Sequence, residues 1–353
     1  MKDLKHLIYF ESLLENANNE LVQKAQAEGN LALGYTCYHV PEALLNVGNC
    51  FSVRLRAPHT GSIDIATYYM SNYTCEFARA LVERGIEGGY QFLDAMIGVD
   101  ACSMMNRAME HFEILKVNDK PNFFVTHCDI PYKITDYTLD SYVKQMRIHV
   151  LDKLTEVYGV DTSDAAIRQA VAEHNEVCSI ISEMAEMRKA ENPVITGYEF
   201  HVINLVSYTC PKALILPYLR ETLKELKKRK PDEKSPFRAR VAIVGSEIDD
   251  PQLTKLIEGC GALVVSDRFC FGSTPGREVI ELKDDEDALR QICLHVMEHS
   301  ECARYISDEK VLQRRVTADR LAEEYNAEGI IYEQMKYCDY WGFERALASH
   351  IMH

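Results

Sequence analysis

Three cysteines that lie far apart in the sequence each occupy a position typical of a site residue in an α/β protein. Cys75 lies near the start of a helical pattern, while Cys102 and Cys338 each follow a short apolar run. Such runs are typical of buried parallel strands, and residues just past the carboxyl ends of those strands converge on one crevice. Three thiolates there can hold an iron–sulfur cluster and leave one iron open to substrate. We therefore predict that these three cysteines are cluster ligands.

The chain contains twelve cysteines in all, which is unlike a disulfide framework because the chain is long and carries no visible secretory signal. Cys37, Cys128 and Cys270 also lie at or just beyond expected strand ends, so they are additional candidate ligands. Cys178 and Cys293 fall inside helical patterns and are predicted to lie in the core. No close C-x-x-C pair occurs, which argues against zinc ribbons and bacterial ferredoxin motifs.

Two other polar residues near the first expected strand are candidates for catalysis. Glu42 follows Pro41 at an expected helix start, where it could orient a substrate or act as a base. A carboxylate stabilised by the helix dipole explains it equally well. His39 lies near a strand end and could donate protons, although a structural role is the more common one for such a histidine.

The composition restricts the class of protein. The 353 residues are 47% hydrophobic and 26% charged, with a net charge of −15, whereas a nucleic-acid-binding protein would carry a basic face. No run approaches the roughly 18 apolar residues of a membrane helix, and the N-terminus shows no apolar signal region. We expect a cytoplasmic protein that binds neither nucleic acid nor membrane.

Strand-like and helical patterns alternate at both ends of the chain, which predicts parallel sheets with helices on both faces. The fold class we expect is α/β, with two doubly wound (Rossmann-like) parallel-sheet lobes joined by a helical region. The first lobe, residues 1–135, begins with a helix over residues 1–30, and long amphipathic patterns fill residues 136–236. The second lobe, residues 237–353, ends after one short helix, so a further strand would be expected beyond it. The first lobe's strands are expected at Leu31–Tyr38, Phe51–Leu55, Phe92–Val99 and Asn122–His127.

Several motifs in this order resemble the 2-hydroxyacyl-CoA dehydratase and benzoyl-CoA reductase superfamily, from about residue 30 to the end. Tyr35–Gly48 resembles its opening motif, and Asp267–Gly272 resembles another recurring segment. Cys75 with Arg79, Cys102 with Arg107, and Cys338 with Asp339 resemble its three cluster ligands in turn.

The resemblance implies that each subunit binds one [4Fe–4S] cluster through Cys75, Cys102 and Cys338. It also implies pairing with a homologous second subunit (a heterodimer) or with itself (a homodimer), and an acyl-CoA substrate. A separate ATP-dependent iron–sulfur activator protein would inject one low-potential electron under anaerobic conditions. In the dehydratases the thioester becomes a ketyl radical anion and loses water, whereas in the reductases the electrons enter an aromatic ring.

The chain departs from the family pattern in two places. It lacks the final strand and helix of the second lobe, so either the sequence is incomplete or a partner covers that edge. Cys128 stands where no family cysteine is expected, which points to the related double-cubane cluster proteins, with an [8Fe–9S] cluster and about twice as many ligands. Cys128, Cys270 and Cys302 would be the extra ligands, but the cysteine that such proteins carry between Cys75 and Cys102 is absent. A non-catalytic iron–sulfur electron relay or scaffold is the third alternative.

Overall fold

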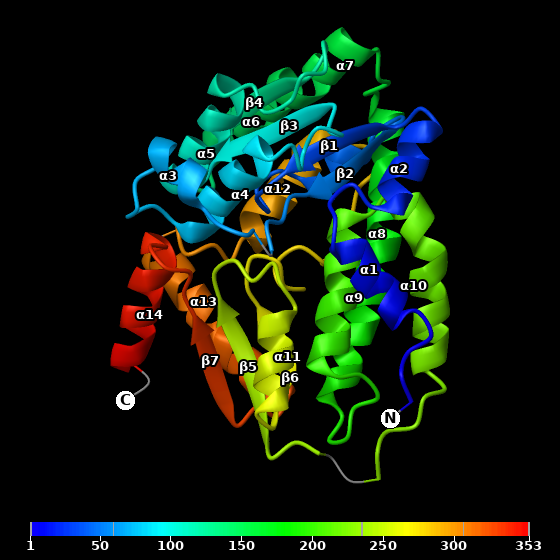
Figure 1. Ribbon diagram of the computed structural model, residues 1–353, viewed down its shortest axis with the longest axis vertical. Helices are drawn as coiled ribbons and strands as arrows, with labels where there is room; N and C mark the ends of the chain where they lie inside the picture. Colours follow the sequence, from blue (N-terminus) through cyan, green and yellow to red (C-terminus); the bar gives the residue numbers. More distant parts are fainter. Residues whose placement is uncertain (1, 59, 234–235, 306, 352–353) are drawn as a thin grey trace.

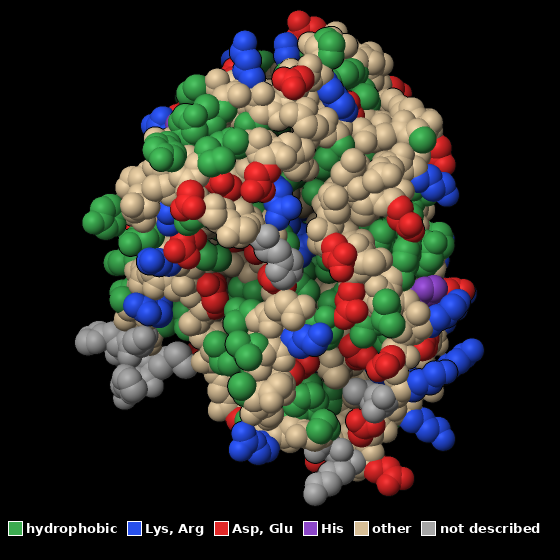
Figure 2. Space-filling model, in the orientation of Figure 1, with side chains coloured by type: hydrophobic (Ala, Val, Ile, Leu, Met, Phe, Trp, Pro, Cys, Tyr) green, Lys and Arg blue, Asp and Glu red, His purple; other side chains and the backbone are tan. Residues whose placement is uncertain are grey.

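The protein folds around two parallel sheets that lie one above the other in Figure 1, beside a column of long helices. The structure is a computed structural model that describes residues 2–58, 60–233, 236–305 and 307–351. Within these ranges no helix is both long and apolar enough to span a bilayer. Figure 2 shows a hollow near the middle of one face, with Lys and Arg side chains visible inside it.

The first sheet has four parallel strands in the order β2-β1-β3-β4. Residues of its two central strands are buried almost throughout, as expected for a parallel sheet covered on both faces. The strands are β1 (Leu31–Tyr35), β2 (Cys50–Arg54), β3 (Ala95–Asp100) and β4 (Phe124–Asp129). The segments that connect them contain η1 (Glu42–Asn46), α3 (Asp64–Tyr69), α4 (Glu76–Ile86) and α5 (Ser103–Ile114).

The second sheet has three parallel strands in the order β6-β5-β7. They are β5 (Ala239–Gly245), β6 (Ala262–Arg268) and β7 (Gly329–Glu333). Its helices are α11 (Gln252–Gly259), α12 (Ala288–His299), α13 (Asp308–Glu324) and α14 (Asp339–Ile351). Although α12 lies between β6 and β7 in sequence, its apolar side chains pack in the same core as β1 and β3. The segment between β6 and β7 therefore crosses to the first sheet and places α12 in that sheet's core.

The remaining helices build the column and the outer face of the first sheet. They are α1 (Leu7–Leu14), α2 (Glu20–Ala27), α6 (Asp136–Met146), η2 (Arg147–Asp152), α7 (Lys153–Tyr158), α8 (Asp164–Glu186), η3 (Met187–Lys189), α9 (Gly197–Thr209) and α10 (Lys212–Leu226). Helix α9 is buried on nearly all sides, because it packs against α1, α8, α10, α11 and both sheets.

The α/β fold class with two parallel sheets is confirmed, whereas several element boundaries differ from the prediction. The segment expected as one helix over residues 1–30 forms α1 and α2, because the Asn19 side chain accepts hydrogen bonds from the N–H groups of Leu21 and Val22 and so starts a new helix. The helix expected after Pro41 is the short 3-10 helix η1. The boundaries of the three predicted domains stay a prediction.

Candidate functional site

The three predicted ligands occupy equivalent positions in three separate helix connections. Cys75 is the N-cap residue of α4 and Cys102 that of α5, while Cys338 immediately precedes α14. Cys102 follows β3 and Cys338 follows β7, at the carboxyl ends of strands in different sheets. Cys75 is buried, the other two are partly exposed, and all three are free thiols.

The structure brings these three cysteines together. The rings of Tyr73 and Tyr337 lie 5.8 Å apart, so the segment before Cys75 touches the one before Cys338. Burial raises the pKa of the Cys75 thiol to about 11, and the nearby Cys102 thiol adds to this rise. The pKa of Cys338 is also raised, first by burial and then by the Cys75 and Cys102 thiols. We call Cys75, Cys102 and Cys338 the first thiol group.

Backbone N–H groups in the first turn of the following helix act on each thiol of this group. They lower the thiol pKa and so oppose the effect of burial, which is the larger influence in each case. A helix N-terminus favours a thiolate over a thiol. The N–H groups belong to Phe77 and Ala78, to Met104 and Met105, and to Trp341.

A second group of three cysteines, Cys37, Cys270 and Cys302, lines one cavity of about 40 Å³. Burial is the main reason that the pKa of each of these thiols is raised, and the charges of neighbouring thiols contribute to it. For Cys302 one of these neighbours is Cys102, so the second group adjoins the first. Cys128 lies elsewhere, fully buried inside β4 in the core of the first sheet.

The spacing of these thiols bears on the kind of group they could hold. In the parts of the chain that the structure describes, no three His, Cys, Asp or Glu side chains are arranged to bind a single metal ion. Three neighbouring cysteines, each at the start of a helix, are a suitable donor set for an iron–sulfur cluster.

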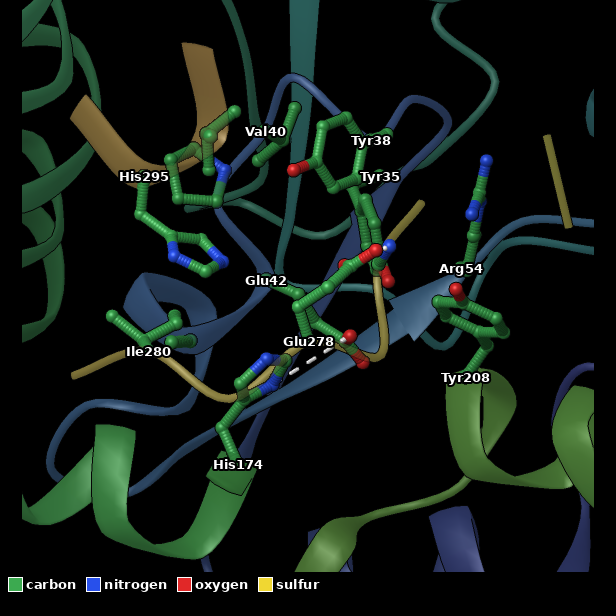
Figure 3. A pocket seen from close by; sticks show the side chains of 14 residues that line it. Tyr35, Tyr38, Val40, Glu42, Arg54, His174, Tyr208, Glu278, Ile280 and His295 are labelled. Carbon is green, nitrogen blue, oxygen red and sulfur yellow. Dashed lines mark hydrogen bonds and ion pairs between the residues drawn. The ribbon is translucent and has the colours of Figure 1, made fainter. Parts of the chain in front are cut away.

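The Glu42 carboxylate lies at the centre of a buried ion-pair network, and Figure 3 shows its contact with His174. Lys212 Nζ lies 2.5 Å from its Oε1, Arg277 Nη1 lies 2.7 Å from its Oε2, and His174 Nδ1 is 3.8 Å away. Burial alone would raise the Glu42 pKa, but the positive charges of Arg277 and Lys212 overcome that effect and hold it well below its usual range. An ionised carboxylate engaged on both oxygens is poorly suited to act as a general base.

His39 is likewise buried, with Nε2 at 2.9 Å from Ser300 Oγ and Nδ1 at 3.4 Å from Cys37 Sγ. Burial, supported by the charges of Arg304 and Arg54, lowers its pKa to about 3. The imidazole is therefore neutral near pH 7 and has a single N–H to donate.

Sequence reasoning missed the two cations that fix Glu42, and it did not group Cys37 with Cys302. Lys212 begins α10 directly after Pro211, and a lysine at the start of an apolar helix is a weak signal for a buried ion pair. Arg277 follows the glycine-containing loop at residues 272–276 and carries no local signal. The pairing of Cys37 with Cys302 depends on the packing of α12 against the first sheet, which no local pattern reveals.

Comparisons with known proteins find related sequences that match nearly the whole chain. A model of the family described as "2-hydroxyglutaryl-CoA dehydratase, D-component" matches residues 37–353. The (R)-phenyllactyl-CoA dehydratase beta subunit of Clostridium sporogenes is 20% identical over 331 residues, which is 94% of this chain and 85% of that protein. A benzoyl-CoA reductase subunit of Thauera aromatica is 20% identical, over 90% of this chain and 81% of its own. The (R)-2-hydroxyglutaryl-CoA dehydratase beta subunit of Acidaminococcus fermentans is also 20% identical, over 94% of this chain and 88% of that protein.

Proposed function

Because the chain belongs to the 2-hydroxyglutaryl-CoA dehydratase D-component family, we propose that it is the [4Fe–4S]-binding subunit of a radical 2-hydroxyacyl-CoA dehydratase or benzoyl-CoA reductase type of enzyme. The observation that carries the proposal is the meeting of Cys75, Cys102 and Cys338 at adjoining helix starts. These thiols would hold the cluster, and the helix N–H groups behind them would stabilise their ionised form. When bound, the cluster supplies low-potential one-electron reduction of a CoA thioester.

The proposal includes partners. All three relatives are named as single subunits, two of them as beta subunits, and so belong to multi-subunit enzymes. We therefore expect a homologous second subunit or a second copy of this chain. An ATP-dependent iron–sulfur activator would deliver the electron, and the complex would work in the cytoplasm on an acyl-CoA.

Iron counting on single-cysteine variants tests the ligand set. Anaerobically purified wild-type protein should contain about four irons per chain for one [4Fe–4S] cluster. Cys75→Ser, Cys102→Ser and Cys338→Ser should each lose most of this iron and the accompanying electron paramagnetic resonance signal. Cys260→Ser is the matched control, because Cys260 is exposed and lies outside both thiol groups. Unchanged iron in Cys102→Ser would remove this ligand assignment.

A second candidate function, a double-cubane reductase of small molecules, is favoured by one observation: the cavity lined by Cys37, Cys270 and Cys302. The two thiol groups together offer six cysteines, enough for a fused [8Fe–9S] cluster. Wild-type protein would then contain about eight irons per chain, and Cys302→Ser would lose iron as Cys102→Ser does. Four irons, unaffected by Cys302→Ser, would exclude this candidate.

Substrate binding separates an enzyme from an electron relay or scaffold. Titration of the reduced protein with acyl-CoA should change the spectrum of the cluster if substrate meets it. A cluster that is present but indifferent to every acyl-CoA tested would leave only the relay or scaffold function.

A further inference from the structure

Arg304, in the loop between α12 and α13, is a buried cation that no carboxylate of the described residues pairs with. The residue is 1% exposed, and no Asp or Glu oxygen in those parts of the chain lies within 4.0 Å of its guanidinium nitrogens. Nη2 donates to the Ile130 carbonyl oxygen at 3.1 Å, whereas Nε and Nη1 are buried without a hydrogen-bond partner there. The guanidinium lies 4.1 Å from the ring centre of Tyr132 and 5.5 Å from that of Tyr305. Burial lowers the pKa of Arg304, and the groups that oppose this effect are these two tyrosines and the Cys302 thiol.

The other fully buried arginines each have a negative neighbour. Arg54 lies near the Glu247 carboxylate, which raises its pKa against the effect of burial, and the rest form ion pairs. An arginine keeps its proton when it is buried, and a buried charge without a partner is strongly unfavourable. The surroundings of Arg304 therefore lack a negative group. The ion pairs of the other arginines are Arg188–Asp267, Arg268–Glu301, Arg277–Glu42 and Arg314–Glu344.

The register of the first sheet places the Arg304 guanidinium near Cys102. Strands β3 and β4 pair in parallel with Asp100 opposite Asp129, so Cys102 and Ile130 both follow the sheet at the same edge. Because Arg304 donates to the Ile130 carbonyl oxygen, its charge lies at that edge too. Burial is the main influence on the Cys102 thiol and raises its pKa, while the charge of Arg304 is among the influences that lower it.

The same charge reaches the start of α14, which follows Cys338. Tyr340 lies in the first turn of this helix. Burial raises the pKa of the Tyr340 hydroxyl, Tyr132 and Cys102 add to the rise, and the charge of Arg304 opposes it. Arg304 thus lies close to two of the three connections that carry the first thiol group.

One carboxylate also acts on the first thiol group. The charge of Glu247 contributes to the raised pKa of all three thiols, after the larger effect of burial. Arg54 opposes the charge of Glu247, whereas no carboxylate of the described residues pairs with Arg304. The field of Arg304 therefore favours negative charge on these thiols, and a thiol binds metal as the thiolate.

We propose that Arg304 is a positioning residue that supplies the counter-charge of the first thiol group and so raises the reduction potential of the cluster bound there. This inference rests on the function proposed above. Reduction adds one negative charge to a cluster held by three thiolates, and a fixed positive charge nearby stabilises that more negative form. Since the guanidinium is excluded from water, salt screens its field less than that of a surface charge.

Redox titration of the anaerobically purified protein, followed by electron paramagnetic resonance, tests the proposal. Arg304→Met removes the charge and should shift the cluster to a more negative potential. At a fixed potential its ratio of reduced to oxidised cluster should fall about tenfold, which is about 59 mV for one electron. Arg304→Lys keeps the charge and should restore most of the wild-type potential.

Arg240→Met is the matched control, because it removes one positive charge far from the thiols. The Arg240 guanidinium also donates only to carbonyl oxygens among the described residues. It lies at the start of β5, whereas the end of β5 lies beside the end of β7, from which the chain runs on to Cys338. Its potential should equal that of the wild type.

The outcomes distinguish this inference from the proposed function. Wild-type protein that holds no cluster overturns both. Equal potentials in wild type and Arg304→Met, or an equal shift in Arg240→Met, overturn this inference alone. Arg304→Met leaves no ion pair broken and should fold; if it does not, Arg304→Gln, which can still donate to Ile130, takes its place.

A second measurement decides the case in which the variant folds but retains no cluster. In cluster-free protein at pH 8, Cys102 should react with iodoacetamide several-fold more slowly in Arg304→Met than in wild type, because its thiolate has lost the nearby cation. Mass spectrometry of the Cys102 peptide gives both rates. Equal rates overturn the inference.

Discussion

Single side chains in this protein owe their chemistry to burial more than to their type. The sequence suggests His39 as a proton donor, and its neighbours Ser300 and Cys37 do place both ring nitrogens in contact with polar atoms. Exclusion from water nevertheless lowers its pKa to about 3, so the ring carries no positive charge at the pH of the cell. A role for His39 is thus limited to that of a neutral hydrogen-bonding group.

This burial predicts how stability depends on pH. The pKa of His39 is about 3 in the folded state and about 6.5 in the unfolded chain, so the unfolded state binds the proton first. The contribution of His39 to the free energy of unfolding is fully present above pH 6.5 and is lost as the pH falls towards 3. At pH 5 the loss is roughly 2 kcal/mol. Urea unfolding should show that the free energy of unfolding falls less between pH 7 and pH 5 for His39→Gln than for wild type. Equal losses would contradict the neutral buried ring.

At the scale of elements, the end of β5 is fitted closely to the end of β7. Ser246 donates hydrogen bonds from N and Oγ to Glu333 Oε2, at 3.0 and 2.7 Å. The Met335 N–H donates to Ser246 Oγ at 2.6 Å. These bonds fix the turn that leads from β7 to Cys338. Gly245 permits them, because a methyl group there would collide with the Glu333 carbonyl oxygen.

Gly245→Ala is therefore expected to destabilise the protein by about 1–3 kcal/mol, as overpacking does. It should also reduce the iron retained, because the turn before Cys338 must shift. Gly259→Ala is the matched control, since a methyl group there meets no atom within 4 Å, and it should be neutral or slightly stabilising. Thermal unfolding and iron content of the two variants measure both effects, and equal behaviour of the two would contradict the argument.

At the scale of the whole molecule, Glu42 joins three parts of the chain. It lies in η1 next to the first sheet, Lys212 begins the long helix α10, and Arg277 follows β6 of the second sheet. All three side chains are almost completely buried. This network joins η1 to the helical column and to the loop that follows β6.

Glu42→Gln leaves two buried cations with a neutral partner and should destabilise the protein by about 3–5 kcal/mol. The pKa of Glu42 is held below its unfolded value of about 4.3. The contribution of Glu42 to the free energy of unfolding is therefore present above that pH and is lost on acidification below it. Glu176→Gln, which breaks the exposed pair with Arg220, should cost less than about 1 kcal/mol. Denaturant unfolding at pH 7 measures the free energy of unfolding of the two variants. Similar losses of stability in both would argue against the network.

The sequence allowed the α/β class and the placing of Cys75, Cys102 and Cys338 at element ends to be predicted, because both follow from local apolar runs and helix starts. The grouping of Cys37, Cys270 and Cys302 did not follow, because it requires α12 to pack under the first sheet. Long-range packing, which a single sequence does not display, decides these positions.

The Glu42–Arg277 pair also dictates an order of events during biosynthesis. The two residues are 235 positions apart, so the ribosome releases the carboxylate long before its guanidinium partner. Until then Lys212 is the only one of these two cations that can have reached Glu42, so one carboxylate oxygen still lacks its ion pair. The nascent protein thus completes its interior only after Arg277 has emerged, which makes chains truncated before that point natural targets for chaperones and proteases.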